Sequence, residues 1–170
     1  LLVNKKLFDE KGLSYPKTWD DMLKIADQTS ESDGAVMIMR GFDFVTYDNV
    51  MYTWLAMLMS KGASYYNDDG TFNFTSPEAV DAMTQLVSYV VDKKYTNLDA
   101  LTGGGGGEGH YFLYEDQAMM VARGPWVISE GIEMYGLEQG VDFDYIAMPW
   151  YGDKKAFAAE TGWGLVVAES

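Results

Sequence analysis

The tripeptide Gly124-Pro125-Trp126 carries the side chain best placed to contact a ligand. Residues 118–122 predict a buried strand, and the glycine and proline predict a sharp turn into a helix from about Pro125 to Tyr135. Trp126 would then lie on the first helical turn, at the carboxyl end of the strand, where ligands bind in open α/β sheets. The N–H groups at a helix start can also donate to ligand oxygens. A core tryptophan is the alternative, and this one residue does not overturn it.

The acidic pairs and the single histidine give no comparable signal for catalysis. The closest acidic pairs are Glu115-Asp116 and Glu130 with Glu133. A glycoside hydrolase needs two carboxylates ~5–9 Å apart across a sugar. Adjacent helical residues point away from each other, and an i, i+3 pair is common on a solvated face. His110 has no serine or cysteine partner in its sequence context, so we expect a surface or loop histidine.

The acidic turn at residues 67–70 does not fit a calcium loop. With Gly70 at the sixth position of such a loop, the first and last positions are Tyr65 and Ser76, and neither supplies a carboxylate. The sequence instead predicts a hairpin turn before an edge strand at residues 71–74. The chain has no cysteine, which excludes disulfides, thiolate nucleophiles and cysteine-type zinc sites. We expect no metal and no cofactor.

Composition narrows the class of ligand. The 170 residues carry 12 basic and 26 acidic side chains, a net charge of −14. This charge argues against duplex nucleic acid and anionic membrane surfaces, which need an excess of Lys and Arg. Aromatic residues reach 15%, with 5 Trp and 12 Tyr. Flat apolar rings beside many hydrogen-bonding groups suit a neutral polyhydroxyl ligand better than a phosphate or an acid.

Local signals predict strands that alternate with helices along one compact unit. Thr18 with Asp21 predicts a capping box, and Ser76-Pro77-Glu78 predicts a second strong helix start. The predicted helices are 4–10, 18–28, 47–60, 76–94, 111–115 and 125–135, and the predicted strands are 1–3, 35–39, 71–74, 118–122, 144–148 and 162–168. Residues 30–34 predict a polar turn before a buried strand, and Ala79, Met83, Leu86 and Val90 are predicted to face inward. The class is therefore α/β, a small sheet flanked by helices.

Two features concern the boundaries of the unit. Residues 103–107 are five consecutive glycines, which predict a flexible linker, either natural or an engineered splice. Both ends read as strands cut in mid-course, so we expect a piece excised from a longer protein. An ordinary chain with terminal strands is the alternative.

The motifs, taken in order, resemble the sugar-binding proteins of ABC importers, of the maltose-binding type. The matching segments are residues 3–8, 12–13 and 16–21 (family pattern YNKDLF…GL…PKTWDE), 52–54 with 62–63 (an aromatic helix, then GG), 71–80 (a strand, then SPEAV), 117–126 (GKAAM…GPW) and 162–165. The resemblance covers nearly the whole chain. The chain departs from it at Val3, where the family usually has tyrosine, and at the glycine run, where the family has an ordinary helix and loop.

The resemblance implies one lobe of a type II periplasmic-binding fold, the second lobe in chain order, spanning residues 1–170. Residues 1–4 then end the first crossover between the lobes, and residues 162–170 begin the second. The resemblance also implies that Trp126 stacks on a sugar. The further ligand contacts that it implies are Trp163, Tyr47, Met51, Arg123 and Glu160. For Trp163 and Trp54 a core role is an equal alternative, and Trp19 is expected to be structural.

The partners implied by the resemblance are a carbohydrate, in particular an oligosaccharide, and an ABC permease reached through the full-length protein. An exposed half-cleft around Trp126 also predicts self-association. The location implied is extracytoplasmic, in the periplasm or as a cell-surface lipoprotein, and we expect no signal sequence within these 170 residues.

Two other classes stay open at this point: an acidic glycoside hydrolase or lyase, and a sensor or adhesion module on the same fold. Hydrolysis of labelled oligosaccharides identifies the first. The absence of permease genes beside the gene identifies the second.

The glycine run gives a prediction about stability. Five glycines offer no side chain to bury and lose much entropy when ordered. Replacing residues 103–107 with a serine-containing linker of equal length should leave the melting temperature nearly unchanged. A drop of many degrees would mean that a specific backbone conformation is required there.

Overall fold

The first strand of the chain is the centre of the main sheet. The computed structural model describes residues 1–34, 36–46, 49–99 and 108–151. Strand β1 (Leu2–Val3) pairs antiparallel with β4 (Met120–Val121) on one side and with β5 (Asp144–Tyr145) on the other. Leu2 lies opposite Val121 and Tyr145, and Val3 lies opposite Met120 and Asp144.

The segment 40–43 runs along the outer side of β4, parallel to it. Arg40 bridges Ala118 and Asp43 bridges Val121, both in parallel register. The Asp43 N–H donates to the Met120 carbonyl and the Asp43 carbonyl accepts from the Ala122 N–H, each at 2.8 Å. Because the two segments are parallel, the chain that follows residue 43 and the chain that follows residue 121 leave the sheet at the same edge.

Side-chain alternation gives the sheet two buried faces. Leu2 and Val121 point into a cluster with Leu113, Val127 and Phe143. Val3 and Met120 point into a larger cluster on the other face, whose members include Phe8, Trp19, Met22, Phe42, Trp54, Met57 and Leu86. Successive strand residues face opposite sides, so cross-strand partners share a face. With both faces covered, β1 and β4 are apolar throughout rather than alternating.

Six helices have bounds among the described residues: α1 (Lys5–Glu10), α2 (Trp19–Thr29), α3 (Asn49–Ser60), α4 (Pro77–Val91), α6 (Gly109–Tyr114) and α7 (Val127–Tyr135). The sequence signals for their starts are confirmed. Thr18 and Asp21 form a complete capping box, and the Ser76 side chain accepts from the Ala79 N–H. Gly12 and Gly62 follow α1 and α3 with φ of 64° and 87°.

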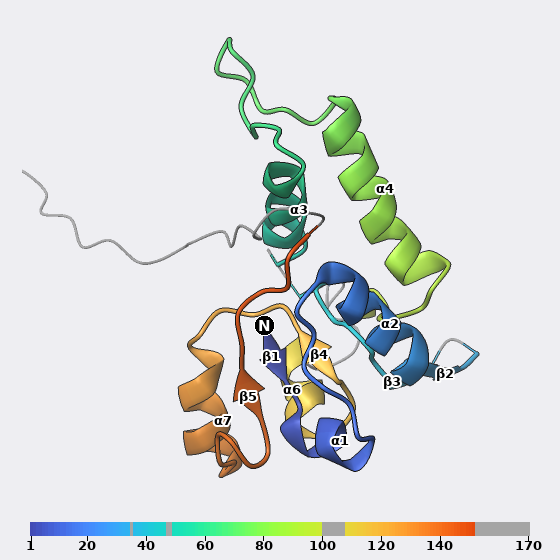
Figure 1. Cartoon of the computed structure of the whole chain (residues 1–170), viewed down its shortest axis with the longest axis vertical. Helices are drawn as coiled ribbons and strands as arrows, with labels where there is room; N and C mark the ends of the chain where they lie inside the picture. Colours follow the sequence, from blue (N-terminus) through green and yellow to red (C-terminus); the bar gives the residue numbers. More distant parts are fainter. Residues whose placement is uncertain (35, 47–48, 100–107, 152–170) are drawn as a thin grey trace, which may run out of the picture.

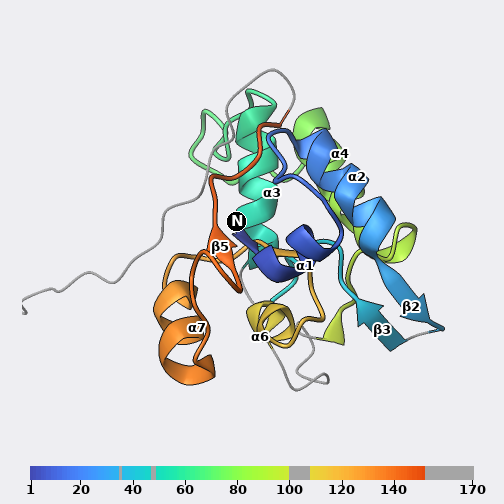
Figure 2. The same ribbon diagram turned by 60° about the horizontal axis from the view of Figure 1, so that its bottom comes forward.

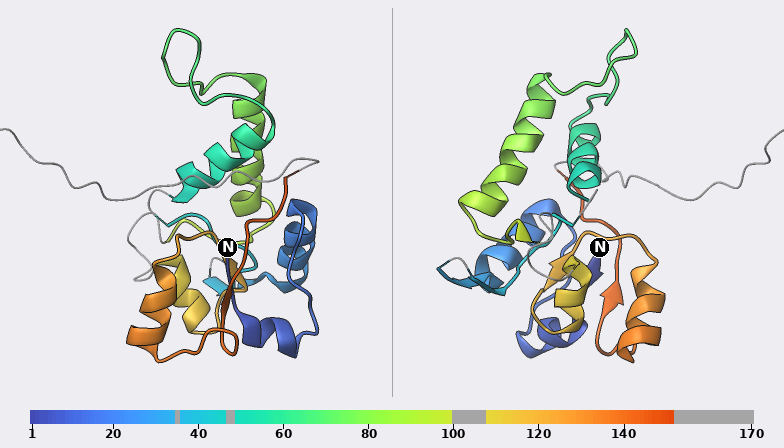
Figure 3. Two further views of the ribbon diagram at one scale, coloured as in Figure 1. Left: turned by 60° about the vertical axis from the view of Figure 1, so that its left-hand side comes forward. Right: turned by 180° about the vertical axis from the view of Figure 1, so that it is seen from behind.

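The helices divide between two ends of the molecule. Figure 1 shows α1, α6 and α7 beside the main sheet at one end and α3 and α4 at the other. The segment between α3 and α4 extends beyond both helices in Figures 1 and 3. Figure 2 shows α2 lying next to the pair β2 (Glu31–Asp33) and β3 (Val36–Met39), away from α7. The helix with the Gly-Pro-Trp motif therefore lies beside the main sheet.

The hairpin β2–β3 corrects two expectations. Residues 30–34, predicted as a turn, supply strand β2, which pairs antiparallel with β3. The strand predicted at 35–39 is present as β3 but is not buried, since Val36 and Ile38 are 67% and 46% exposed. The reason is that β3 pairs with the local polar strand β2 rather than with the main sheet. The local sequence does not indicate which strand β3 pairs with.

Two smaller differences concern α4 and the segment 71–74. On α4, Met83 is exposed and Ala82 is buried instead, while Ala79 and Leu86 face inward as predicted. The predicted strand 71–74 contributes only the single antiparallel bridge between Phe72 and Tyr66. The glycine run 103–107 and the predicted strand 162–168 lie outside the described residues.

A buried carboxylate joins these parts. Asp43 is fully buried, and it accepts a hydrogen bond from the Thr96 hydroxyl at 2.6 Å and one from the Val45 N–H at 3.3 Å. The Arg40 Nε lies 3.5 Å from the same carboxylate. Burial raises the pKa of Asp43, and the contacts with Thr96 and Arg40 oppose that rise. A carboxylate that has only donors around it is stabilised in its ionised form.

Removal of this carboxylate should destabilise the fold strongly. Asp43→Ala leaves the buried Arg40 guanidinium without its counter-charge, for which we expect a loss of about 3–5 kcal/mol in the free energy of unfolding. Urea denaturation measures the loss. Asp81→Ala is the matched control, because it removes the exposed ion pair with Lys61 and should change stability far less. Equal effects of the two substitutions would contradict the role given to Asp43.

Candidate functional site

Trp126 lies at the edge of the sheet with about half of its surface in solvent. It is 49% exposed, and it follows β4 after a turn of four residues, Ala122 to Pro125. The Arg123 guanidinium carbon lies 5.6 Å from the centroid of its ring, within the range of a cation–π contact. An indole that is supported from within and open to solvent can cover an apolar face of a ligand.

Gly124 is the residue that lets the indole fold back on the turn. A Cβ atom built on Gly124 would overlap three carbons of the Trp126 ring. No positive φ is needed at Gly124, so its small size rather than its backbone freedom is what the turn requires. Any larger residue at this position must displace the indole.

The start of the helix differs in one respect from the prediction. Helix α7 begins at Val127, so Trp126 occupies the N-cap position rather than the first turn. The N–H groups of Val127 and Ile128 donate to the carbonyls of Gly124 and Pro125, at 3.5 and 3.1 Å. These two groups are therefore engaged within the turn and do not serve as donors to a ligand.

Below the turn, Arg123 joins a buried polar network. Its side chain is 5% exposed and forms an ion pair with Glu108, the residue that precedes α6. The Arg123 Nε donates to His110 Nδ1 at 3.2 Å, and the His110 Nε2 lies 2.8 Å from a Glu130 carboxylate oxygen. Tyr111 donates to the other oxygen of Glu130 at 3.0 Å. The network thus links α6, the turn after β4 and α7.

The network corrects the expectations for His110 and Glu130. His110 is 1% exposed rather than a surface residue, and Glu130 binds it rather than facing solvent alone. Burial lowers the pKa of His110, and the nearby Glu130 opposes that fall. The pairing joins residues 20 positions apart, which no local pattern reveals.

The remaining members of the acidic pairs are not arranged for catalysis. Asp116 accepts a hydrogen bond from Asn4 and forms an ion pair with Lys6. Glu115 and Glu133 are exposed. Each carboxylate therefore either neutralises a structural partner or lies in solvent.

The predicted contact residues are only partly described. Arg123 and Trp126 lie together, as stated above. Met51 lies in the first turn of α3 and is 40% exposed. Tyr47, Glu160 and Trp163 lie outside the described residues.

The other described tryptophans divide into core and surface. Trp19 and Trp54 are each 3% exposed, and their indole N–H groups donate to the Tyr89 hydroxyl and the Ala79 carbonyl. Both are structural, which confirms the expectation for Trp19. Trp150 is 50% exposed and lines an open, largely apolar groove of about 530 Å³ between residues 15–18 and 146–150. The sequence analysis did not single out Trp150.

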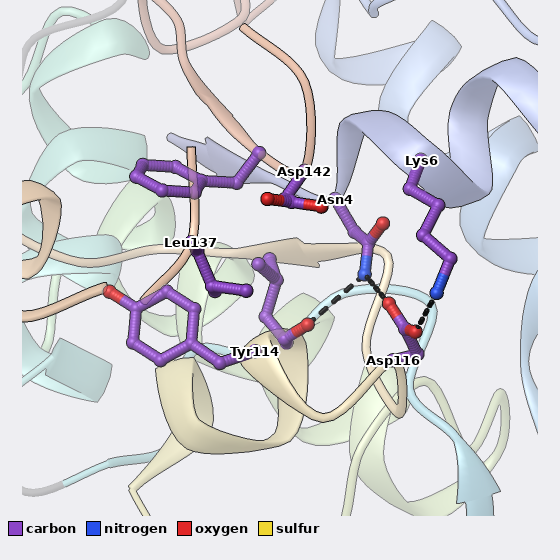
Figure 4. Close-up of a pocket in the computed structure, with 8 residues that line it drawn as sticks. Asn4, Lys6, Tyr114, Asp116, Leu137 and Asp142 are labelled. Carbon is purple, nitrogen blue, oxygen red and sulfur yellow. Dashed lines mark hydrogen bonds and ion pairs between the residues drawn. The ribbon is translucent and has the colours of Figure 1, made fainter. Parts of the chain in front are cut away.

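A small cavity near the start of the chain is lined by polar side chains that bind one another. It measures about 60 Å³ and is lined by residues of α1, α6 and the segment 137–143. Figure 4 shows Asn4 donating to the Leu113 carbonyl and to Asp116, which also binds Lys6. The Asn4 side-chain oxygen accepts from the Leu7 N–H and caps α1. The cavity therefore marks a structural junction rather than a ligand site.

Metal-binding groups and membrane-spanning helices are the other features to consider in the described residues. Within 1–34, 36–46, 49–99 and 108–151, no group of three or more His, Cys, Asp or Glu is arranged to hold a metal ion. Across the same ranges, no helix has the length and apolar character needed to cross a membrane.

Comparison with solved structures finds several matches to this fold. The Listeria monocytogenes ABC substrate-binding protein Lmo0181, in complex with cycloalternan, matches with a TM-score of 0.69 and 25% identity over 90% of this chain. The maltose/maltodextrin-binding domain MalE of Bdellovibrio bacteriovorus, bound to maltotriose, matches with a TM-score of 0.66 and 15% identity over 93% of this chain. A solute-binding protein of Thermotoga lettingae, bound with α-D-tagatose, gives 0.64 and 20% over 88%.

These matches cover only part of the longer proteins. The chain spans 37% of the Listeria protein and 38% of each of the other two. A search of curated protein sequences finds no match. The model of the bacterial extracellular solute-binding proteins matches residues 1–170, the whole sequence. The α/β fold agrees with that match, and the chain belongs to the bacterial extracellular solute-binding protein family.

Proposed function

We propose that the protein containing this chain binds an oligosaccharide and delivers it to an ABC permease. In this proposal residues 1–170 form the second of two lobes, and the ligand lies between them. The lobe contributes Trp126 as a stacking surface and performs no chemistry. The protein acts outside the cytoplasmic membrane, as its family does.

The half-exposed indole of Trp126 is the observation that carries the proposal. Its ring lies over Gly124 and next to the Arg123 guanidinium, and much of its remaining surface is open. A pyranose presents an apolar patch of C–H groups that such a ring can cover. The sugar hydroxyls then need partners around the ring, because an unpaired buried polar group costs about 1–3 kcal/mol.

The course of the chain favours a position at one edge of the main sheet for several of the proposed contact residues. Segment 40–43 and β4 are parallel, so residues 44–46 and the Gly-Pro-Trp turn leave the sheet at the same edge. Tyr47 directly follows Thr46, and Met51 lies on the helix that comes next. We include Tyr47, Met51, Arg123, Glu160 and Trp163 as further contacts, with Trp126 as the main one.

The family relatives support the class of ligand. The Listeria protein, at 25% identity, is complexed with cycloalternan, an oligosaccharide-binding role that we extend to this chain. The net charge of −14 agrees with a neutral ligand and opposes an anionic one. Of the two closest acidic pairs, Glu130 binds His110 and Asp116 binds Asn4 and Lys6, so neither pair offers two free carboxylates to a hydrolase.

Removal of the stacking ring should weaken binding in the full-length protein. Trp126→Ala removes the apolar surface under the sugar, so we expect the Kd for the best oligosaccharide to rise about tenfold to a hundredfold. Isothermal titration calorimetry measures the change. Trp150→Ala is the matched control, since Trp150 is equally exposed, at 50%, but lies in a different groove. If Trp150→Ala weakens binding and Trp126→Ala does not, the site is wrongly placed.

Gly124→Ala provides a second variant for the same measurement. The new methyl group occupies the position of the indole and forces it to move, while the backbone can stay as it is. We expect a loss of affinity close to that of Trp126→Ala, with little change in the melting temperature. Wild-type affinity in this variant would mean that the position of the indole does not matter.

The 170-residue chain alone should fold but bind sugar weakly. A cleft between two lobes contacts its ligand from both sides, and one lobe supplies about half of the contacts. If the intact protein binds at micromolar Kd, about 8 kcal/mol, the isolated lobe should bind at millimolar Kd or weaker. Its exposed indole should also favour self-association at high concentration. Parallel titrations of both proteins test this, and tight binding by the isolated chain would show that its site is complete.

A further inference from the structure

We propose that His110 is a positioning residue for the Trp126 site, and that it acts through Arg123 in a pH-dependent way. This inference rests on the proposed function, because the site it controls is the proposed sugar contact. His110 does not touch the ligand in this scheme. It fixes the guanidinium against which the indole packs.

The hydrogen bonds assign the protonation state of the ring. The Arg123 Nε always carries a hydrogen, so the His110 Nδ1 that lies 3.2 Å from it must accept. The single ring proton is therefore on Nε2, which donates to the Glu130 carboxylate at 2.8 Å. Neutral His110 thus connects an acceptor site for Arg123 to a fixed anion on α7.

The surroundings of His110 leave it little freedom to adjust. It is 1% exposed, and the rings of Tyr111 and Tyr114 lie 4.3 and 5.7 Å from it. The ionisable groups around it come from every neighbouring element. They are Glu108, Tyr111 and Tyr114 beside or on α6, Arg123 after β4, Glu130 on α7, Tyr135 with its ring tilted against both tyrosines, and Asp43 next to Gly109. A ring enclosed in this way responds to a proton by changing its partners rather than by rotating into solvent.

Protonation reverses the role of one nitrogen. Imidazolium carries a hydrogen on both nitrogens, so Nδ1 can no longer accept from Arg123, and two cationic donors face each other. The nearest acceptor for the new hydrogen is the Glu108 carboxylate, 3.5 Å from Nδ1, which already binds Arg123. Arg123 then loses the His110 acceptor and shares the Glu108 carboxylate with an imidazolium of like charge, so its guanidinium shifts from its position against the Trp126 ring.

The direction of the pH effect follows from the burial of the ring. Burial lowers the pKa of His110 below its usual value of 6.5, so the neutral form prevails in the folded protein at neutral pH. The unfolded chain then binds more protons than the folded chain just below pH 6.5, and stability falls as the pH drops through that window. The support for Trp126 is complete at neutral pH and is lost as the pH falls through the lowered pKa.

The first test needs no ligand and no variant of His110. In ¹H–¹⁵N spectra of the full-length protein, the Trp126 indole signal is assigned by its loss in Trp126→Phe. We expect this signal and the His110 ring signals to shift together, with one midpoint, as the pH falls from neutral through the lowered pKa of His110. If His110 titrates while the Trp126 signal stays constant, the inference is wrong.

Two conservative variants separate positioning from general structure. In His110→Asn, the amide oxygen replaces the Nδ1 acceptor for Arg123 and does not titrate. In His110→Gln, the amide nitrogen replaces the Nε2 donor to Glu130, and the acceptor for Arg123 is lost. We expect His110→Asn to keep the neutral-pH position of the Trp126 signal at every pH, and His110→Gln to displace it at every pH. Glu133→Gln, an exposed change on the same helix, should titrate as wild type does.

Sugar binding gives the second readout. Wild-type affinity should fall about tenfold from neutral to acidic pH, the size expected when a hydrogen bond to a charged group is lost. His110→Asn should bind with a flat pH profile, and His110→Gln should bind about tenfold more weakly throughout. Wild-type affinity in His110→Gln, or a wild-type pH profile in His110→Asn, would overturn the inference.

The two proposals can fail separately. If the Trp126 signal follows His110 but no oligosaccharide binds the full-length protein, the positioning inference is supported and the proposed function is wrong. If Trp126→Ala abolishes sugar binding but the Trp126 signal ignores both pH and His110→Gln, the proposed function is supported and the inference is wrong.

Discussion

The buried Asp43 carboxylate is the interaction on which the edge of the sheet depends. The backbone hydrogen bonds of Asp43 with Met120 and Ala122 align segment 40–43 with β4. The Asp43 side chain accepts a hydrogen bond from Thr96 and lies beside the Arg40 guanidinium. The start of α6 packs directly on it, since a Cβ on Gly109 would lie 2.6 Å from the Asp43 Oδ1. A charge this deeply buried tolerates few rearrangements of its donors, so it fixes the elements that supply them.

A series of contacts connects Asp43 to the exposed Trp126 ring. Gly109 also donates to Thr46 at 2.8 Å, so the start of α6 is fixed to the segment that leaves the sheet beside it. The next residue, His110, contacts Arg123, and Arg123 lies against Trp126. The hydrogen bond between Gly109 and Thr46 is buried, the one between Arg123 and His110 is partly buried, and Trp126 at the end of the series is half exposed. The series ends at an aromatic surface that is supported from the inside and open on the outside, which is the arrangement that a stacking contact needs.

Much of this architecture is predictable from the sequence, but the site is predictable only in part. The caps at Thr18 and Ser76 and the Gly-Pro-Trp turn are local signals, and the structure contains each of them near its predicted position. Strand β2 and the exposure of β3 depend on which strands pair, and a stretch of three polar residues does not reveal its partner. His110 looked like a surface residue because its partners lie 13 and 20 positions away. Gly124 is predictable in part. The glycine predicts a turn, but only the structure shows that its small size leaves room for the Trp126 indole.

The most direct test of the Trp126 contact is a crystal structure of the full-length protein with its tightest-binding oligosaccharide. The account predicts a pyranose ring within about 4 Å of the exposed part of the Trp126 indole, with the Arg123 guanidinium still on the side of the protein. We also predict that the other lobe, the first in chain order, covers the opposite face of that sugar. A ligand bound in the groove beside Trp150, or anywhere else with the Trp126 ring left in solvent, would contradict the account.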